Sequence, residues 1–196
     1  MSTQALEAAE AEPSAPADDR SISTARANVV ALAIIPVLAA LVLVPFGVLH
    51  GTGSLGGAWN RITAPLLFIP LVLVCIVVHE ALHGVGFLAA GVPRSSLKFG
   101  VQARTLTPYA TCTVPITVRR YRLAGALPAV VLGVLPMLAS WITGRAELAM
   151  FAFWMLAFAG GDLLILWLIR DLPAETRVID HPERAGCRIV PAGNAA

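Results

Sequence analysis

PLLFIPLVLVCIVVHEALHGVGFLAA, residues 65–90, is apolar as far as His79 and carries three strongly polar side chains, those of His79, Glu80 and His83. A helix needs about 20 mostly apolar residues to cross the roughly 30 Å hydrocarbon core of a bilayer, because it rises about 1.5 Å per residue. The stretch is long enough. It predicts a membrane-spanning helix that carries three polar groups inside the apolar layer.

Three other segments meet the same requirement: residues 29–49, 123–142 and 148–169. The chain has 196 residues, of which 57% are hydrophobic and 13% are charged. A soluble domain is about half apolar and about a quarter charged, so this composition indicates a chain that is solvated by lipid. We therefore predict an all-α membrane protein with about four transmembrane helices and the lipid bilayer as a partner.

The basic residues are distributed unevenly about these helices. Of the 14 Lys and Arg residues, only Arg61 and Arg145 fall outside the N-terminal segment, the connection between the second and third helices, and the segment after the fourth. The positive-inside rule places these basic segments in the cytoplasm. We predict a multi-pass protein of the cell membrane with both termini cytoplasmic. The net charge of +2 does not indicate nucleic-acid binding, and no feature predicts an oligomeric state.

The predicted organisation is one transmembrane domain, residues 29–170, between two tails. Residues 1–28 are rich in Ala, Glu, Pro and Ser and contain five acidic side chains. A secretory signal starts with a short basic region, so this composition predicts a disordered acidic tail instead. Residues 171–196 are predicted to form a cytoplasmic C-terminal tail.

The connection between the second and third helices does not have a helical pattern. It contains two β-prone runs, Leu97–Val101 and Tyr109–Val118, separated by a polar stretch that ends in Pro108. This arrangement predicts a small β-hairpin on the cytoplasmic side. An irregular loop is the alternative.

His79-Glu80-Ala81-Leu82-His83 is an HExxH sequence on the second predicted helix. A spacing of four places both imidazoles on one helix face, where they can bind one Zn²⁺. Glu80 is close enough to act as a general base on a metal-bound water. A chain of this composition contains about 0.003 such motifs by chance. Accidental occurrence without a metal is the alternative, and burial in lipid argues against it, because ionisable groups at that depth are costly.

A catalytic zinc takes three protein ligands and leaves one position open. The extended HExxHxxGxxH pattern is excluded, because Ala89 stands where its third His would be. Asp162 lies in the middle of the fourth, otherwise uncharged helix and is the better candidate. Its neighbours Gly160 and Gly161 would allow the fourth helix to approach the second closely. The alternative is a structural carboxylate, paired with Arg170 or capped by a hydroxyl.

The depths of the two groups in the membrane support this choice. His79 lies 14 residues beyond Pro65, and Asp162 lies 14 residues beyond Leu148. Both helices run inward from the outer face in the predicted topology. At about 1.5 Å per residue, each group is about 21 Å in, so the two are level with each other.

Four short motifs together resemble a known family: HEALHG, Tyr109-Ala110-Thr111-Cys112, Gly160-Gly161-Asp162 and Val178-Ile179-Asp180-His181-Pro182. Over about residues 65–190 the chain resembles the "putative zincin peptidase" family of small multi-pass membrane proteins. That family is similar to site-2 proteases, which pair an HExxH helix with a later Asp. The resemblance implies that His79, His83 and Asp162 bind Zn²⁺ and that Glu80 is the base. Site-2 proteases have Asn-Pro-Asp-Gly-like or Leu-Asp-Gly motifs, whereas this chain has Gly-Gly-Asp-Leu.

The sequence therefore predicts a membrane-embedded zinc metalloprotease that hydrolyses peptide bonds in a protein or peptide substrate, whether membrane-bound or soluble. The hairpin would accept an unwound substrate stretch as an added strand. Two alternatives stay open: a metal-ion or proton transport protein that uses the same His/Asp cluster, and an inactive scaffold. The sequence also leaves open whether Cys112 packs under the hairpin or reaches zinc as a thiolate, and whether Asp180 and His181 line the cytoplasmic entrance.

Overall fold

The computed structural model describes residues 19–102 and 107–191. The predicted tail up to residue 18 lies outside these residues, as does the turn of the predicted hairpin. The helices are α1 (Thr24–Ala33), α2 (Ile35–His50), α3 (Gly53–Ile62), α4 (Pro65–Ala89), α5 (Val118–Pro128), α6 (Leu135–Thr143), α7 (Ala146–Phe158) and α8 (Gly160–Leu168). A π-helical segment, Ala129–Val134, joins α5 to α6, and a 3₁₀ turn, Arg94–Ser96, follows α4.

The chain is mostly helical, and three of its helical stretches are long and apolar enough to cross a membrane. They are Thr24–His50, Pro65–Ala89 and Val118–Thr143, where the first and third each consist of consecutive helices. The fourth predicted span is not one straight helix. It consists of α7 and α8, which are bent by 51° relative to each other. The bend falls at Ala159, and it turns α8 so that Gly160 packs against Ala31 of α1.

Helix α7 lies among α2, α3 and α6 and carries much of the bundle's core. Small side chains such as Ala149 and Ala152 are fully buried on it, so neighbouring helices can approach closely. Large side chains fill the remaining space, among them Phe46 and Phe153. Helix α4, in contrast, packs mainly on α5 and leaves most of its own apolar side chains exposed.

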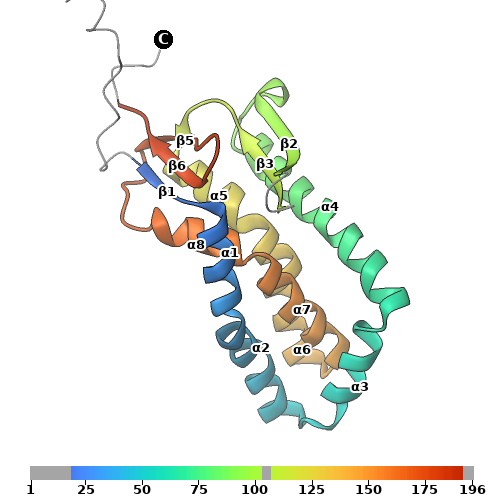
Figure 1. Ribbon diagram of the computed structural model, residues 1–196. Coiled ribbons are helices and arrows are strands. Elements are labelled where there is room, and N and C mark those ends of the chain that lie inside the picture. The colour runs from blue at the N-terminus through green and yellow to red at the C-terminus, as the bar shows by residue number, and fades with distance from the viewer. Residues whose placement is uncertain (1–18, 103–106, 192–196) are drawn as a thin grey trace, which may run out of the picture.

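Two antiparallel sheets lie at one end of the helices, at the end opposite to α3 (Figure 1). Their strands are β1 (Asp19–Ile22), β2 (Leu97–Gln102), β3 (Thr107–Cys112), β4 (Ile116–Thr117), β5 (Arg177–Asp180) and β6 (Ala185–Ile189). Strands β2 and β3 form the predicted hairpin. The second predicted run is shorter than expected, because it ends at Cys112 and its continuation, β4, pairs with β5 in the other sheet.

The larger sheet has the strand order β1-β6-β5-β4 and joins the two ends of the described chain. Residues 19–28, assigned above to a disordered tail, form β1 and the beginning of α1, and β5 and β6 fall within the predicted C-terminal tail. Gly186 of β6 has φ 123°, and a side chain there would collide with the Arg20 carbonyl group of β1. The pairing therefore requires glycine at position 186. It was not predicted, because β1 and β6 lie at opposite ends of the described chain.

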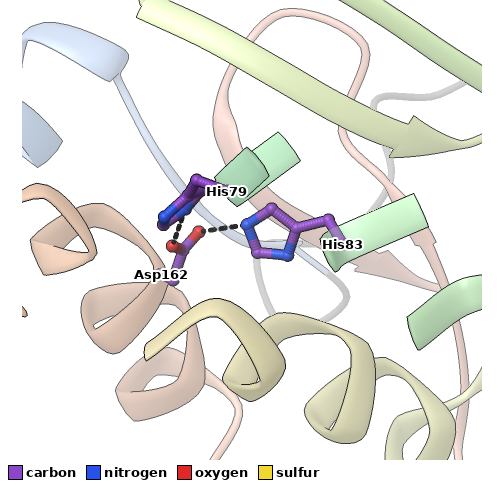
Figure 2. A group of neighbouring side chains, drawn as sticks. All are labelled: His79, His83 and Asp162. Atoms are coloured by element: carbon purple, nitrogen blue, oxygen red, sulfur yellow. Dashed lines mark hydrogen bonds and ion pairs between the residues drawn. The ribbon is translucent and has the colours of Figure 1, made fainter. Parts of the chain in front are cut away.

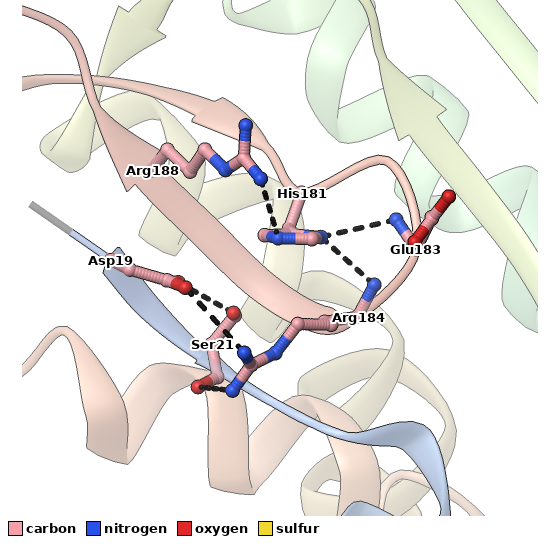
Figure 3. A network of polar contacts seen from close by, with 6 residues as sticks. All are labelled: Asp19, Ser21, His181, Glu183, Arg184 and Arg188. Carbon is pink, nitrogen blue, oxygen red and sulfur yellow. Dashed lines mark hydrogen bonds and ion pairs between the residues drawn. The ribbon is translucent and has the colours of Figure 1, made fainter. Parts of the chain in front are cut away.

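A polar network fixes the β5–β6 turn to β1 (Figure 3). The Nδ1 atom of His181 accepts hydrogen bonds from the backbone N–H groups of Glu183 and Arg184, and Arg188 contacts Nε2 at 2.9 Å. Arg184 donates to the Ser21 carbonyl group at 3.0 Å. The turn therefore requires a lone pair on Nδ1.

This turn is expected to loosen in acid. Burial, together with the positive charge of Arg188, lowers the pKa of His181 below its usual 6.5. The folded turn then binds fewer protons than the unfolded chain, so its stability is complete above pH 6.5 and falls as the pH drops below that value. Amide hydrogen exchange should show lower protection factors at Glu183 and Arg184 at pH 5.5 than at pH 7.5. Equal protection at both pH values would contradict this account.

Candidate metal centre

The structure brings together the three side chains predicted to bind metal. The carboxylate of Asp162 lies between the two imidazoles (Figure 2). Its Oδ2 is 2.9 Å from Nε2 of His79, and its Oδ1 is 3.3 Å from Nε2 of His83. The candidate ligand atoms all lie within 4.8 Å of one another. Within residues 19–102 and 107–191, these three side chains form the one group of His, Cys, Asp or Glu residues that could hold a metal ion. The predicted proximity is observed, and the role of these residues as ligands stays a prediction.

Helix α4 presents the two imidazoles on one face, as the spacing of four requires. The ring centroids are 4.9 Å apart, and the rings are nearly perpendicular. The Nδ1–H group of His83 donates to the carbonyl oxygen of Ala124 on α5 at 3.0 Å. This contact depends on Gly86, where an added Cβ atom would lie 2.6 Å from the Ala124 Cα atom. The absence of a side chain at Gly86 thus lets α5 approach α4 closely enough to orient His83.

Asp162 comes from the first turn of α8, just after the bend. The alternative of a pair with Arg170 is not what the structure shows, because Arg170 donates to the Trp167 carbonyl group and stacks over the Trp167 ring. The prediction that the two glycines allow α8 to approach α4 closely is wrong. Gly160 provides close approach to α1, not to α4, and an added Cβ atom at Gly161 would meet no other atom within 4 Å.

The cluster adjoins a cleft of about 810 Å³ at the sheet end of the molecule. Glu80, His83 and Asp162 line this cleft, together with residues of β3 and of the β5–β6 turn. The Oε2 atom of Glu80 is buried and has no hydrogen-bond partner among the described residues. A buried carboxylate oxygen without a partner is unusual and indicates a missing donor, such as water or substrate.

Asp180 and His181 also line this cleft, which agrees with one of the two alternatives left open by the sequence. The sequence did not identify the Ala124 carbonyl group, which binds His83, or Tyr121, which also lines the cleft. Ala124 offered no signal, because a backbone acceptor can belong to any residue type. Asp180 was visible as part of a motif, but its contacts were not.

Cys112 is a small buried residue at the end of the hairpin strand β3. Its side chain is 2% exposed, and its thiol donates to the carbonyl group of Val114 at 3.3 Å. Burial raises the pKa of the Cys112 thiol, which opposes formation of the thiolate that would bind a metal. Its sulfur is not part of the metal-ligating group. The structure therefore favours the packing role over the latent thiolate.

The donor set fits a zinc ion. Two imidazoles, here from α4, and one carboxylate, here from α8, are a common ligand set for catalytic zinc. Such a zinc ion also keeps one coordination position open for water. The Nδ1–H group of His83 donates a hydrogen bond to the Ala124 carbonyl group. In a neutral ring the other nitrogen, Nε2, then carries a lone pair, and this lone pair faces an Asp162 oxygen. Two electron-rich atoms facing each other are stabilised by a cation between them. The bond from His83 to Ala124 is also the kind of outer contact that fixes the tautomer of metal-binding histidines.

The sequence matches the family described as "putative zincin peptidase" over residues 72–177, a range that includes the HExxH motif and Asp162. The match confirms the family resemblance. No curated protein and no solved structure matches the chain.

Proposed function

The chain belongs to the family described as "putative zincin peptidase", and on this premise we propose that it is a membrane-embedded zinc metallopeptidase. One observation carries the proposal: the Asp162 carboxylate lies between Nε2 of His79 and Nε2 of His83, and Glu80 lines the same cleft as His83 and Asp162. His79, His83 and Asp162 would hold the zinc. Their side chains are 12%, 9% and 20% exposed, so the site is largely shielded yet reachable from the cleft.

Zinc supplies a Lewis acid that activates water and polarises a peptide carbonyl group. The residues of the chain supply proton transfer and orientation. The free Oε2 of Glu80 is available to take a proton from water and to pass it to the leaving amine. The Ala124 carbonyl group accepts from Nδ1 and holds the His83 ring in one tautomer, which leaves Nε2 as the atom that would bind the metal.

Strand β3 offers a place for an extended substrate. The Thr113 N–H donates toward β2, to the Ser96 carbonyl group, whereas the Cys112 N–H points away from β2 and donates to Asp180. Successive backbone groups of a strand alternate in direction, so the Ala110 N–H and C=O also point away from β2. The Ala110 N–H faces the Glu80 carboxylate. Since β3 lines the cleft, a substrate strand that displaces this contact can pair with the Ala110 N–H and C=O next to the proposed base.

This pairing predicts a specific effect of Ala110→Pro. Proline removes the outward N–H and is tolerated on the free side of an edge strand. KM should rise so that kcat/KM falls about tenfold, the value of one lost hydrogen bond, with zinc content unchanged. A fall in kcat alone would instead report loss of the contact between the Ala110 N–H and Glu80. Steady-state cleavage of fluorescently labelled casein, an unfolded protein, measures this effect. A specificity constant equal to that of the wild type would rule out pairing at β3.

The proposed membrane placement rests on exposed apolar surface and on charge. Leu66, Leu73 and Val77 of α4 are each at least 60% exposed, and water would solvate such a surface poorly. Both sheets lie at the same end of the helices (Figure 1), which is the end that carries most of the Arg and Lys residues. The positive-inside rule then places this end, both termini and the cleft in the cytoplasm.

Metal analysis of purified protein tests the proposed site. Wild type should bind about one zinc per chain, and His79→Ala or Asp162→Ala should retain only a small fraction, since each change removes one of three ligands. His50→Ala is the matched control, because His50 contacts the Trp141 carbonyl group between two other helices and should leave zinc content unchanged. Wild-type protein without zinc, or full zinc content in Asp162→Ala, would refute the proposed site. Casein cleavage by the same samples tests the peptidase activity.

A further inference from the structure

Asp180, the last residue of β5, accepts hydrogen bonds from two elements that border the metal centre. Its Oδ1 accepts from the Tyr121 hydroxyl group of α5 at 2.5 Å. Its Oδ2 accepts from the Thr111 hydroxyl group and from the Cys112 N–H of β3, both at 2.7 Å. One carboxylate therefore joins β5 to both α5 and β3, through residues that precede Asp180 by 59 and 69 positions.

The contact with α5 leads to the metal ligands. Tyr121 lies three residues before Ala124, and residues at this spacing share one face of a helix. The Ala124 carbonyl group holds Nδ1 of His83. Tyr121 is buried, and its ring packs against that of Phe87 on α4. The hydrogen bond from Tyr121 to Asp180 thus restrains the part of α5 that orients His83.

The contact with β3 leads to the substrate side of the cleft. Thr111 and Cys112 directly follow Ala110, whose N–H and C=O point away from β2. Asp180 occupies the outward N–H of Cys112, so it fixes the end of the strand edge that lines the cleft. Movement of this end would shift the Ala110 groups relative to Glu80.

We propose that Asp180 is a positioning residue that holds α5 and β3 in place around the metal centre. Its contact with Tyr121 maintains zinc affinity. Its contacts with Thr111 and Cys112 maintain substrate binding. The substrate part rests on the proposed peptidase function. The zinc part requires only that His79, His83 and Asp162 bind the metal.

Two conservative variants each remove one contact. Tyr121→Phe should weaken zinc affinity by about three- to tenfold, less than the loss of a direct outer contact of a metal ligand, because Tyr121 acts on His83 through α5. The KM for labelled casein should be unchanged at saturating zinc. Thr111→Val should raise that KM severalfold and leave zinc affinity unchanged. Competition with a fluorescent zinc indicator, on protein in detergent micelles, measures the affinity. Thr143→Val is the matched control, because the exposed Thr143 hydroxyl group donates to the Ala139 carbonyl group within α6 at 2.7 Å, and α6 does not line the cleft.

Two substitutions of Asp180 itself complete the test. Asp180→Asn keeps an oxygen for Thr111 and Cys112, and its amide group can donate to the Tyr121 hydroxyl group, so both parameters should stay within about threefold of wild type. Asp180→Ala should change both parameters. The proposal is overturned if Asn behaves like Ala, or if Tyr121→Phe and Thr111→Val change the same parameter or neither. The single-contact variants decide the matter even where Asp180→Ala does not fold.

Failure of the peptidase function would give a different result. Wild-type protein would then bind zinc without cleaving casein, and Tyr121→Phe would still report on the contact with α5. Hydrogen exchange at the Ala110 amide would report on β3. Thr111→Val should speed this exchange, whereas Tyr121→Phe should not, and equal exchange in both variants would overturn the proposal.

Discussion

Glu80→Gln is expected to lower kcat for casein by about 10²- to 10⁴-fold, the usual contribution of a general base, while one zinc per chain stays bound. Glutamine has nearly the same shape as glutamate but cannot accept a proton from water. The Oε2 atom of Glu80 is free of hydrogen bonds to other described residues, so the substitution breaks no observed contact of that atom. Fold and metal site should therefore be preserved.

The control for this variant is Glu147→Gln. Glu147 pairs with Arg61 of α3. Helix α3 lies at the end of the molecule opposite to the sheets and the cleft (Figure 1). The same chemical change there should leave kcat unchanged. Glu80→Gln with wild-type kcat would exclude Glu80 as the base. A transport protein would instead move zinc into vesicles in both wild type and Glu80→Gln, with no casein cleavage in either.

Gly86→Ala is expected to damage both the fold and the metal centre. The added methyl group would lie 2.6 Å from the Ala124 Cα atom and 3.1 Å from its Cβ atom, so α4 and α5 would have to move apart. Overpacking of this kind costs about 1–3 kcal/mol of stability. The movement also lengthens the hydrogen bond from His83 to Ala124, which should weaken zinc affinity about tenfold or more. Thermal unfolding followed by circular dichroism, together with the zinc competition assay, measures the two effects.

Gly56→Ala provides the comparison, because an added Cβ atom at this α3 position meets nothing within 4 Å. It should unfold at or slightly above the wild-type temperature, since alanine has the higher helix propensity. If Gly86→Ala were as stable as Gly56→Ala and bound zinc normally, close approach of α4 and α5 would not be what orients His83.

The apolar helices and the polar cluster could be predicted from the sequence because lipid imposes strict requirements on both. A spanning helix must be long and apolar, so α4 was expected at residues 65–90 and is found at Pro65–Ala89. Ionisable groups inside such a helix need partners, and equal depth identified Asp162 as the partner of His79. The bend at Ala159 does not disturb this estimate, because it comes only three residues before Asp162.

The remaining features depend on contacts that leave little trace in the sequence. Strand β1 pairs with β6, in a register that joins Asp19 to Arg188, and no local pattern encodes so distant a pairing. Strands β5 and β6 are short, although the β-prone residues of Arg177–Asp180 followed by Pro182 could have suggested a hairpin. The bend between α7 and α8 depends on the packing of Gly160 against Ala31, and a glycine alone does not reveal its neighbour.

Zinc K-edge X-ray absorption of the purified protein tests the central claim most directly. A zinc ion held by His79, His83 and Asp162 should show imidazole scattering from two rings, with nitrogen and oxygen neighbours at about 2.0–2.2 Å and no sulfur. His83→Ala, which lacks one of the three ligands, should retain too little zinc to give this spectrum. Sulfur at about 2.3 Å, or a wild-type spectrum without imidazole scattering, would contradict the proposed metal centre.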